Sequence, residues 1–489
     1  MHSDAGMKEM VGGFVVSLKP LERKGKNLSN PGDVDARAIR GTADLAAYLA
    51  AGCKPAAQFA IGTEHEAFGF HQTGFRSPAY AGPDGINALL RALEARGGGA
   101  PILDHENIIG LKGGQASLSL EPGGQFELSG APLMDLHGTK AELAAHIARL
   151  QAVAPSLGLG FAPLGFHPLA RREDMPWMPK GRYKIMRGYM PKVGTRGLDM
   201  MLRTCTVQVN LDFSSEADMV AKMRVASALQ PLATALFANS PFYEGKPNGR
   251  LSNRAWVWQD TDNQRSGIPE IIFQDGFGFE SYVTWLLNVP MYFVYRDGVF
   301  HDVAGASFRD FMAGGLAALP GVQATLGDFA DHVTTAFPDV RLKKYIETRG
   351  ADSGSPAMML AQSALWTGIF YDQAALAAAS ALIRSISYPE ILELRAQVPQ
   401  TGLKTAFGTG TLRDLAAQVV AIASDGLKAR GRLNPQGEDE RIYLTPLVEI
   451  VAGGPTQAEH WLGRYHGTWQ ADVRRIFDEA RFYTNCLGV

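Results

Sequence analysis

The stretch Thr204-Cys205-Thr206-Val207-Gln208-Val209-Asn210-Leu211-Asp212-Phe213 alternates polar and apolar residues without a break. Successive side chains of a β-strand point to opposite faces, so this period of two predicts a strand with one polar and one apolar face. One interpretation is an antiparallel strand whose polar face meets solvent. The other is a surface, built on Gln208, Asn210 and Asp212, that binds hard cations or a polar substrate. Further strands with the same kind of face would favour the second interpretation.

Three other segments place glutamates at alternating positions. They are residues 61–68, 116–129 and 345–349, and the glutamates on their polar faces are Glu64, Glu66, Glu121, Glu127 and Glu347. The second segment is predicted to be a hairpin, because Pro122-Gly123-Gly124 is typical of a turn. Like charges on one sheet face repel, so five gathered carboxylates would destabilise the fold unless cations neutralised them. If these strands are neighbours, they predict a cation-binding sheet face.

The composition is that of a globular protein. The 489 residues are 46% hydrophobic and 20% charged, and the formal net charge is only -2. This balance does not favour nucleic acid or an anionic membrane as a partner, and no apolar run approaches the roughly 20 residues that span a bilayer. The three cysteines, Cys53, Cys205 and Cys486, form neither a disulfide framework nor a zinc motif. A reducing cytoplasm is the predicted location.

The order of the elements predicts an α+β fold. Residues 1–30 have no strong period and are interpreted as a mobile N-terminal extension, and residues 31–489 as a single catalytic domain that is mainly helical from about residue 355. Strands dominate residues 61–129. Helices are predicted over residues 42–51, 85–96, 139–154, 215–238, 373–386 and 411–429. Strands come first and helices later, without βαβ alternation, which argues against a doubly wound fold.

Common nucleotide and hydrolase motifs are absent. The chain has no P-loop, no Rossmann Gly-x-Gly-x-x-Gly after a strand, no Gly-x-Ser-x-Gly elbow and no His-Glu-x-x-His. If ATP is used, metals and basic side chains must hold it.

A segment without a clear period, residues 171–203, carries nine lysines and arginines. It is either a solvated basic loop or a set of phosphate and carboxylate ligands above the acidic sheet face.

Four further side chains have a structural and a functional interpretation. His65 faces away from Glu64 and Glu66 by strand parity, which favours a packed core histidine over a ligand. Cys205 lies on the apolar side of its strand and is predicted to be buried and inert. Trp256 and Trp258 belong either to the core of an edge strand or to the wall of a substrate pocket.

Five sequence motifs together resemble glutamate–cysteine ligases of the plant and proteobacterial type. They are Ile-Gly-Thr-Glu-His-Glu from residue 61, Leu-Glu-Pro-Gly-Gly-Gln-Phe-Glu-Leu-Ser-Gly from residue 120, Met-Pro-Lys-Gly-Arg-Tyr from residue 178, Leu-Arg-Thr-Cys-Thr-Val-Gln-Val-Asn-Leu-Asp-Phe-Ser-Ser from residue 202, and Tyr-Ile-Glu-Thr-Arg-Gly-Ala-Asp from residue 345. The likeness runs from about Phe59 into the C-terminal region. It implies a curved antiparallel sheet with flanking helices, the carboxylate–amine ligase fold related to glutamine synthetase.

The resemblance also implies a reaction and its cofactors. It is the ATP-dependent joining of the L-glutamate γ-carboxylate to the amine of L-cysteine, through γ-glutamyl phosphate, as the first step of glutathione biosynthesis. ATP is the co-substrate, and two or three Mg²⁺ ions stabilise the charge of the phosphoryl group. The expected partners are these small molecules, without nucleic acid or membrane, and the chain is expected to be a monomer or a homodimer.

Site residues follow from the resemblance position by position. The metal-binding set is Glu64, Glu66, Glu121, Glu127 and Glu347, the catalytic residues are Arg349 and Glu66, and the substrate-binding residues are Arg182, Arg254, Tyr292, Gln208 and Asn210. Asp212 has no assigned role.

Two alternatives remain open, and one departure from the plant pattern carries a prediction. The ligase could use a different amine acceptor, because a single pocket methyl or thiol is worth only about 1–3 kcal/mol. A nucleic-acid or scaffold protein built on the basic segment is the non-enzymatic alternative. Plant members carry regulatory cysteines in segments that here are Leu-His-Gly-Thr-Lys140, His-Asp-Val303, Leu-Ala-Ala318 and Met-Met-Leu360, and none of these residues is a cysteine. No thiol switch of the plant kind is therefore expected.

Overall fold

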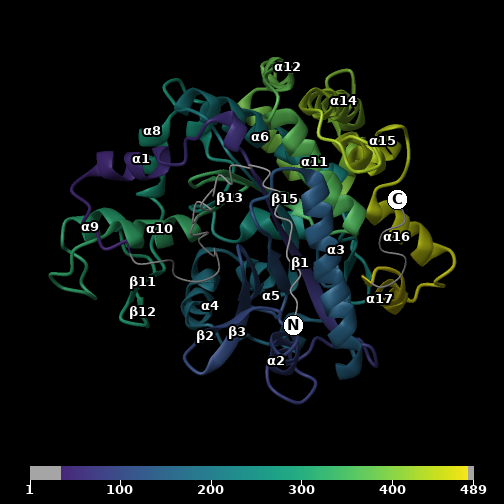
Figure 1. Cartoon of the computed structure of the whole chain (residues 1–489), viewed down its shortest axis with the longest axis horizontal. Helices are drawn as coiled ribbons and strands as arrows, with labels where there is room; N and C mark the ends of the chain where they lie inside the picture. Colours follow the sequence, from purple (N-terminus) through teal and green to yellow (C-terminus); the bar gives the residue numbers. More distant parts are fainter. Residues whose placement is uncertain (1–34, 483–489) are drawn as a thin grey trace, which may run out of the picture.

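The alternating stretch forms strand β7 (Thr206–Leu211), which lies inside a nine-stranded sheet. Figure 1 labels four other strands of this sheet, β1, β2, β3 and β15. The computed structural model describes residues 35–482, so the predicted mobile extension, residues 1–30, lies outside the described residues. The strands of the sheet are β1 (Ile61–His71), β2 (Ala100–Asp104), β3 (Asn107–Gly113), β4 (Ala116–Leu120), β5 (Phe126–Ser129), β6 (Leu159–Ala162), β7, β14 (Val340–Leu342) and β15 (Ile346–Asp352).

The order of the strands brings the glutamate-bearing segments together. It runs β14-β15-β7-β1-β5-β4-β3-β2, with β6 also paired to β1, and each of these pairs is antiparallel. The strands β15, β7, β1 and β5 are therefore consecutive neighbours. This confirms the predicted antiparallel α+β architecture and meets the condition on which the cation-binding face depended.

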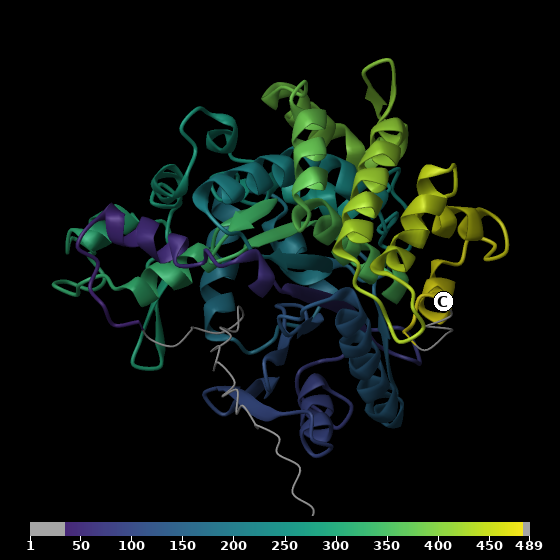
Figure 2. The same ribbon diagram turned by 45° about the horizontal axis from the view of Figure 1, so that its top comes forward.

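Helices flank the sheet and form most of the C-terminal part. They are α1 (Thr42–Ala50), α2 (Ile86–Glu94), α3 (Leu136–Val153), α4 (Gly181–Val193), α5 (Gly197–Arg203), α6 (Glu216–Leu236), α7 (Asn253–Val257), α8 (Phe279–Leu286), α9 (Phe308–Met312), α10 (Leu326–Thr334), α11 (Pro356–Phe370), α12 (Gln373–Ile383), α13 (Tyr388–Thr401), α14 (Leu412–Arg430), α15 (Thr445–Val451), α16 (Gln457–His466) and α17 (Ile476–Glu479). The six predicted helices correspond to α1, α2, α3, α6, α12 and α14. Figure 2 shows the C-terminal helices gathered on one side of the molecule.

Short strand pairs complete the fold. They are β8 (Phe242–Tyr243) with β9 (Lys246–Pro247), β10 (Ser266–Gly267) with β13 (Phe337–Pro338), β11 (Phe293–Arg296) with β12 (Val299–Asp302), and β16 (Ala406–Phe407) with β17 (Gly410–Thr411). No helix between residues 35 and 482 is long and apolar enough to cross a membrane.

The two faces of the sheet differ as strand parity predicts. On the apolar face, Thr63 of β1 hydrogen bonds to Ser363 of α11 over 3.3 Å, and α3 packs against β1. His65 shares this face and is buried, and burial beside His146 lowers its pKa to about 3. The prediction of a packed core histidine is therefore confirmed. Cys205 is also buried, and burial raises the pKa of its thiol.

Asp212, which had no assigned role, fastens the end of β7. Its carboxylate accepts hydrogen bonds from the Nζ atom of Lys54 at 2.5 Å and from the backbone N–H of Ala60 at 2.8 Å. Its own backbone N–H donates to the hydroxyl of Tyr371 at 2.8 Å, and that hydroxyl donates to the carbonyl of Ala60. Asp212 therefore ties β7 to the segment that leads into β1, which keeps the two central strands in register.

The basic segment is not the irregular loop that its sequence suggested, and the tryptophans are not on a strand. Residues 181–203 form α4 and α5, and Trp256 and Trp258 lie in α7 and the 3₁₀ turn Trp258–Asp260 that follows it. Some of the basic side chains have structural partners: Arg172 and Arg203, for example, both bind the carboxylate of Asp199 at 2.6 Å. This segment therefore forms a helical cover over the polar face of the sheet.

Candidate functional site

A cavity lies on the polar face of the sheet and gathers most of the predicted site residues. It encloses about 890 Å³ of space, part of it open to solvent. Among the residues that line it are Glu64, Glu66, Glu121, Glu127, Gln208, Arg182, Arg254 and Arg349. The sheet supplies the floor, while α4, α5 and α7 supply side chains from the other side. Asn210, Tyr292 and Glu347 are not part of its lining.

Gln208 and Asn210 hold one carboxylate at the floor of the cavity. Glu64 on β1 pairs with Gln208 on β7. The Nε2 atom of Gln208 donates to Glu64 at 2.8 Å, and the Nδ2 atom of Asn210 donates to its other oxygen at 2.9 Å. Both amides of the opening stretch therefore orient a glutamate.

The carboxylates of the floor are held in an environment that opposes their negative charge. Burial, with the charges of Glu347 and Glu127 beside it, raises the pKa of Glu64 to about 7. Burial and the nearby charge of Glu121 also raise the pKa values of Glu66 and Glu127. Groups in this state gain most from a bound cation, so the floor of the cavity fits a site for a hard metal ion.

These carboxylates surround the cavity without converging on a single point. Within the part of the chain that the structure describes, no three histidine, cysteine, aspartate or glutamate side chains lie close enough together to hold one ion. Mg²⁺ is commonly bound by one or two carboxylates while substrate phosphates and water fill its other positions. The arrangement therefore fits Mg²⁺ carried in with a phosphate-bearing substrate.

Glu347 has basic partners instead of a place in the cavity wall. Its fully buried carboxylate contacts Arg341 at 2.7 Å, Lys343 at 2.8 Å and Arg349 at 2.8 Å. Although burial acts to raise its pKa, these three cations hold the pKa of Glu347 below its ordinary value. Glu347 is therefore ionised and fixes the direction of Arg349.

Arg349 reaches the cavity from β15 and is held from two sides. Its Nη1 atom donates to Glu347 at 2.8 Å and to the Oε1 atom of Gln208. Gln208 thus connects Arg349 to Glu64, so an arginine and a carboxylate of the cavity floor share one hydrogen-bond network.

Two other arginines carry unsatisfied hydrogen-bond donors. The Nε atoms of Arg182 and Arg254 are buried and have no hydrogen-bond partner among residues 35–482. Arg254 lies on α7, and Ser252, which caps the N-terminus of that helix, donates a hydrogen bond of 2.8 Å to the buried carboxylate of Asp352. Buried unpaired donors are costly, and a planar guanidinium suits a carboxylate, so both side chains fit an acidic substrate.

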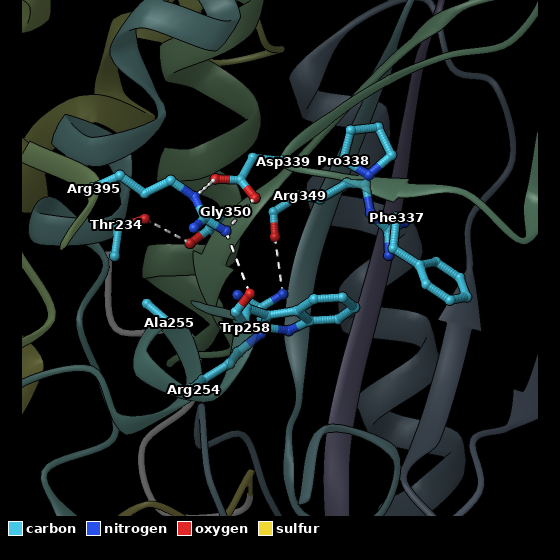
Figure 3. A pocket seen from close by; sticks show the side chains of 10 residues that line it. All are labelled: Thr234, Arg254, Ala255, Trp258, Phe337, Pro338, Asp339, Arg349, Gly350 and Arg395. Carbon is cyan, nitrogen blue, oxygen red and sulfur yellow. Dashed lines mark hydrogen bonds and ion pairs between the residues drawn. The ribbon is translucent and has the colours of Figure 1, made fainter. Parts of the chain in front are cut away.

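A smaller chamber lies next to the cavity (Figure 3). It encloses about 410 Å³ and shares Arg254, Trp258, Phe337 and Arg349 with the larger cavity. Arg395 and Asp339 form an ion pair of 2.6 Å on its far side, and Arg395 also donates to the carbonyl of Trp258. Trp258 therefore belongs to a pocket wall, one of the two interpretations that the sequence left open.

Tyr292 lies beneath the cavity instead of facing it. It is buried, its ring stacks on the guanidinium of Arg265 at 3.8 Å, and its hydroxyl contacts the sulfur of Met190. The next residue, Phe293, lines the cavity. The structure thus places Tyr292 one layer behind the substrate pocket.

Arg341 lines the cavity but was not among the predicted site residues. It pairs across the strands β14 and β15 with Glu347. The signal was present, because Arg341 and Lys343 alternate with Val340 and Leu342 as a polar face does. Strand β14 is only three residues long, and its alternation could not be interpreted until its pairing with β15 was known.

Comparison with known proteins identifies the family to which these features belong. Residues 60–479 match the model of glutamate-cysteine ligase family 2. The chain belongs to this family. The match covers the whole sheet, all the residues that line the cavity and most of the C-terminal helices, so the predicted family is confirmed.

Relatives in plants are similar over most of their length. The chain is 52% identical to the chloroplastic glutamate–cysteine ligase of Brassica juncea over 436 residues, which are 89% of this chain and 83% of that relative. It is also 52% identical to the chloroplastic enzyme of Arabidopsis thaliana over 436 residues, 89% of this chain and 82% of the relative. The prediction of a cytoplasmic location is wrong on this evidence, since these relatives are named chloroplastic.

A solved structure shares the fold at low sequence identity. The glutamate–cysteine ligase of Francisella tularensis, solved in complex with AMP, matches 87% of this chain and 89% of its own with a TM-score of 0.51 and 12% identity. This likeness supports the predicted carboxylate–amine ligase fold.

Proposed function

We propose that this chain uses ATP to join the γ-carboxylate of L-glutamate to the amine of L-cysteine, the first step of glutathione biosynthesis. The observation that carries the proposal is that one cavity of a family member combines buried glutamates with Arg182, Arg254 and Arg349. A carboxylate is a poor electrophile. The γ-carboxylate of glutamate first attacks the γ-phosphorus of ATP, which forms γ-glutamyl phosphate and releases ADP. The amine of cysteine then attacks this acyl phosphate, and phosphate leaves.

The chain's own residues have distinct parts in this proposal. Arg182 and Arg254 hold substrate carboxylates with their free donors. Arg349 faces the transferring phosphoryl group, where its fixed charge stabilises the transition state without reorganisation. Glu66 lines the same cavity, and a carboxylate there could accept the proton that the attacking amine loses.

The proposal includes Mg²⁺ because the cavity floor offers carboxylate oxygens, which are the ligands that this ion prefers. Glu64, Glu66, Glu121 and Glu127 would hold it, and Glu347 would contribute through its hold on Arg349. When bound, Mg²⁺ neutralises charge on the phosphate oxygens. The number of ions, two or three, and the state of the chain as monomer or homodimer stay predictions.

The identity of the amine acceptor can be tested by ADP release. In a coupled assay with ATP, Mg²⁺ and L-glutamate, we expect L-cysteine to be the preferred acceptor over L-alanine by about 10-fold or more, as one buried group allows. Equal rates with the two would contradict the cysteine specificity and favour a ligase for another amine. Calorimetry with Mg-ATP addresses the scaffold alternative, which predicts no heat and salt-dependent binding of RNA or DNA.

Activity should not respond to thiol reductants. The segments that end at Lys140, Val303, Ala318 and Leu360, where plant members are expected to carry regulatory cysteines, contain none here, and Cys53 and Cys205 are both free. We expect enzyme pre-incubated with dithiothreitol and enzyme pre-incubated without it to have the same turnover, measured by product formation after both samples are desalted and given freshly dissolved cysteine. Strong inactivation by dithiothreitol would contradict this prediction.

A further inference from the structure

Strand β15 contains a bulge at the residue that the proposed chemistry depends on. Thr348 pairs with Val209 and Ala351 with Val207, so three steps along β15 match two steps along β7. The extra residue lies within Arg349–Gly350. A bulge re-aims side chains and removes backbone groups from the ladder, and those groups then need other partners.

Helix α6 supplies those partners for Gly350. The Oε1 atom of Gln230 accepts a hydrogen bond from the N–H of Gly350 at 2.9 Å, and the hydroxyl of Thr234 donates to its carbonyl at 3.1 Å. The two side chains are four residues apart and therefore lie on the same face of α6. A Cβ atom on Gly350 would collide with Gln230 Oε1, so the contact leaves no room for a side chain there.

Gln230 has no direct access to substrate. It is 1% exposed and lines neither the cavity nor the chamber of Figure 3. Its Nε2 atom has no hydrogen-bond partner in the described chain, so Gly350 is the sole partner that the structure gives its side-chain amide. A buried amide whose N–H donors are unpaired is costly. The cost points to a role for its oxygen, which accepts the hydrogen bond from Gly350.

The bulge connects directly to two of the arginines that line the cavity, Arg349 and Arg254. The backbone N–H of Arg349 donates to the carbonyl of Asp339 at 3.0 Å, and its carbonyl accepts from the Nη2 atom of Arg254 at 2.9 Å. A shift of Gly350 would therefore move the Arg349 backbone and the hydrogen bond that links the two guanidinium-bearing residues.

We propose that Gln230 is a positioning residue, which holds the bulge of β15 so that Arg349 points at the transferring phosphoryl group. This inference rests on the role proposed for Arg349. Gln230 acts through Gly350 and touches no reacting atom. A misplacement of about 1 Å can cost about 100-fold in rate, so the hydrogen bond from Gly350 matters far more for turnover than for stability.

The test is Gln230→Met, which keeps the volume and removes the acceptor. We expect kcat to fall about 10- to 100-fold, with little change in the KM for glutamate and in the melting temperature. The matched control is Gln362→Met on α11, a buried glutamine whose amide atoms have no hydrogen-bond partner between residues 35 and 482, and it should keep wild-type turnover. Gln230→Glu retains an acceptor oxygen and should recover most of the lost kcat.

A double-mutant cycle with Arg349→Ala separates positioning from a general structural effect. If Gln230 acts through Arg349, adding Gln230→Met to Arg349→Ala should lower the remaining kcat by less than about twofold. Wild-type kcat in Gln230→Met, or the same fold loss in both backgrounds, would overturn the inference. Should Gln230→Met fail to fold, Thr234→Val, which removes the other hydrogen bond to Gly350, takes its place in the same cycle. A wild-type protein that releases no ADP with glutamate and cysteine would instead count against the proposed function.

Discussion

Replacing Glu121 with glutamine should lower turnover by at least about 100-fold while the protein stays folded. Glu121 lines the cavity and is only partly buried. The other floor glutamates differ, since Glu64 is held by two amides and Glu66 accepts from the N–H of Thr206 at 2.9 Å. Glutamine keeps the shape of Glu121 but removes the charge that a metal ion needs. The loss should therefore fall on catalysis alone.

Initial rates of ADP release at several Mg²⁺ concentrations, together with melting temperatures, check this expectation. A weakened metal site predicts that high Mg²⁺ recovers part of the lost rate. Glu106→Gln is the matched control, because Glu106 is an exposed carboxylate between β2 and β3, outside the cavity. Wild-type turnover in Glu121→Gln at every Mg²⁺ concentration would remove Glu121 from the proposed metal set.

Strand parity was sufficient to predict the acidic face of the sheet. The alternation around Glu64, Glu127 and Gln208 depends only on the local period of a strand, and the structure keeps it. The partners of the carboxylates could not be predicted in this way, because they depend on which strands are neighbours. Glu347 is the clearest case, since the cation opposite it, Arg341, comes from β14, which pairs with β15 alone.

Helix α4 shows how composition can hide a period. Tyr183, Met186 and Met190 are spaced by three and four residues and are all buried, as one face of a helix requires. The same helix carries four basic residues, and Pro191 occurs within its last turn, so the segment resembled a loop. The helical spacing of the buried residues was present in the sequence. The composition of the segment, however, is dominated by the basic residues of its other face.

The bulge at Gly350 has no signature that one sequence can supply. A bulge adds one residue to a strand, and the motif Glu-Thr-Arg-Gly-Ala-Asp alternates well enough for a regular strand. Its partners on α6 lie more than 100 residues away in the chain. The sequence therefore predicts Arg349 as a site residue, and Arg349 does line the cavity, but the contacts that aim its side chain could not be predicted.

Replacing Arg349 with alanine should reduce turnover by about 1,000-fold or more, the size expected for an arginine that stabilises a transferring phosphoryl group. Glu347 would keep Arg341 and Lys343 as partners, so its buried charge would remain compensated and the fold should survive. Arg91→Ala, at a half-exposed position on α2, is the control for loss of a surface arginine.

The distribution of the loss between kcat and KM tests the role of Arg349 more sharply than its size. An arginine whose contact forms in the transition state lowers kcat and kcat/KM together, whereas one that merely binds glutamate raises KM at constant kcat. Arg254→Ala, which removes a proposed carboxylate ligand, should show the second pattern. We therefore expect steady-state kinetics with varied glutamate to separate these two neighbours, although a hydrogen bond of 2.9 Å joins them. A kcat within tenfold of wild type in Arg349→Ala would contradict the role of Arg349 at the phosphoryl group. It would also contradict the inference that Gln230 of α6 positions Arg349 through the bulge.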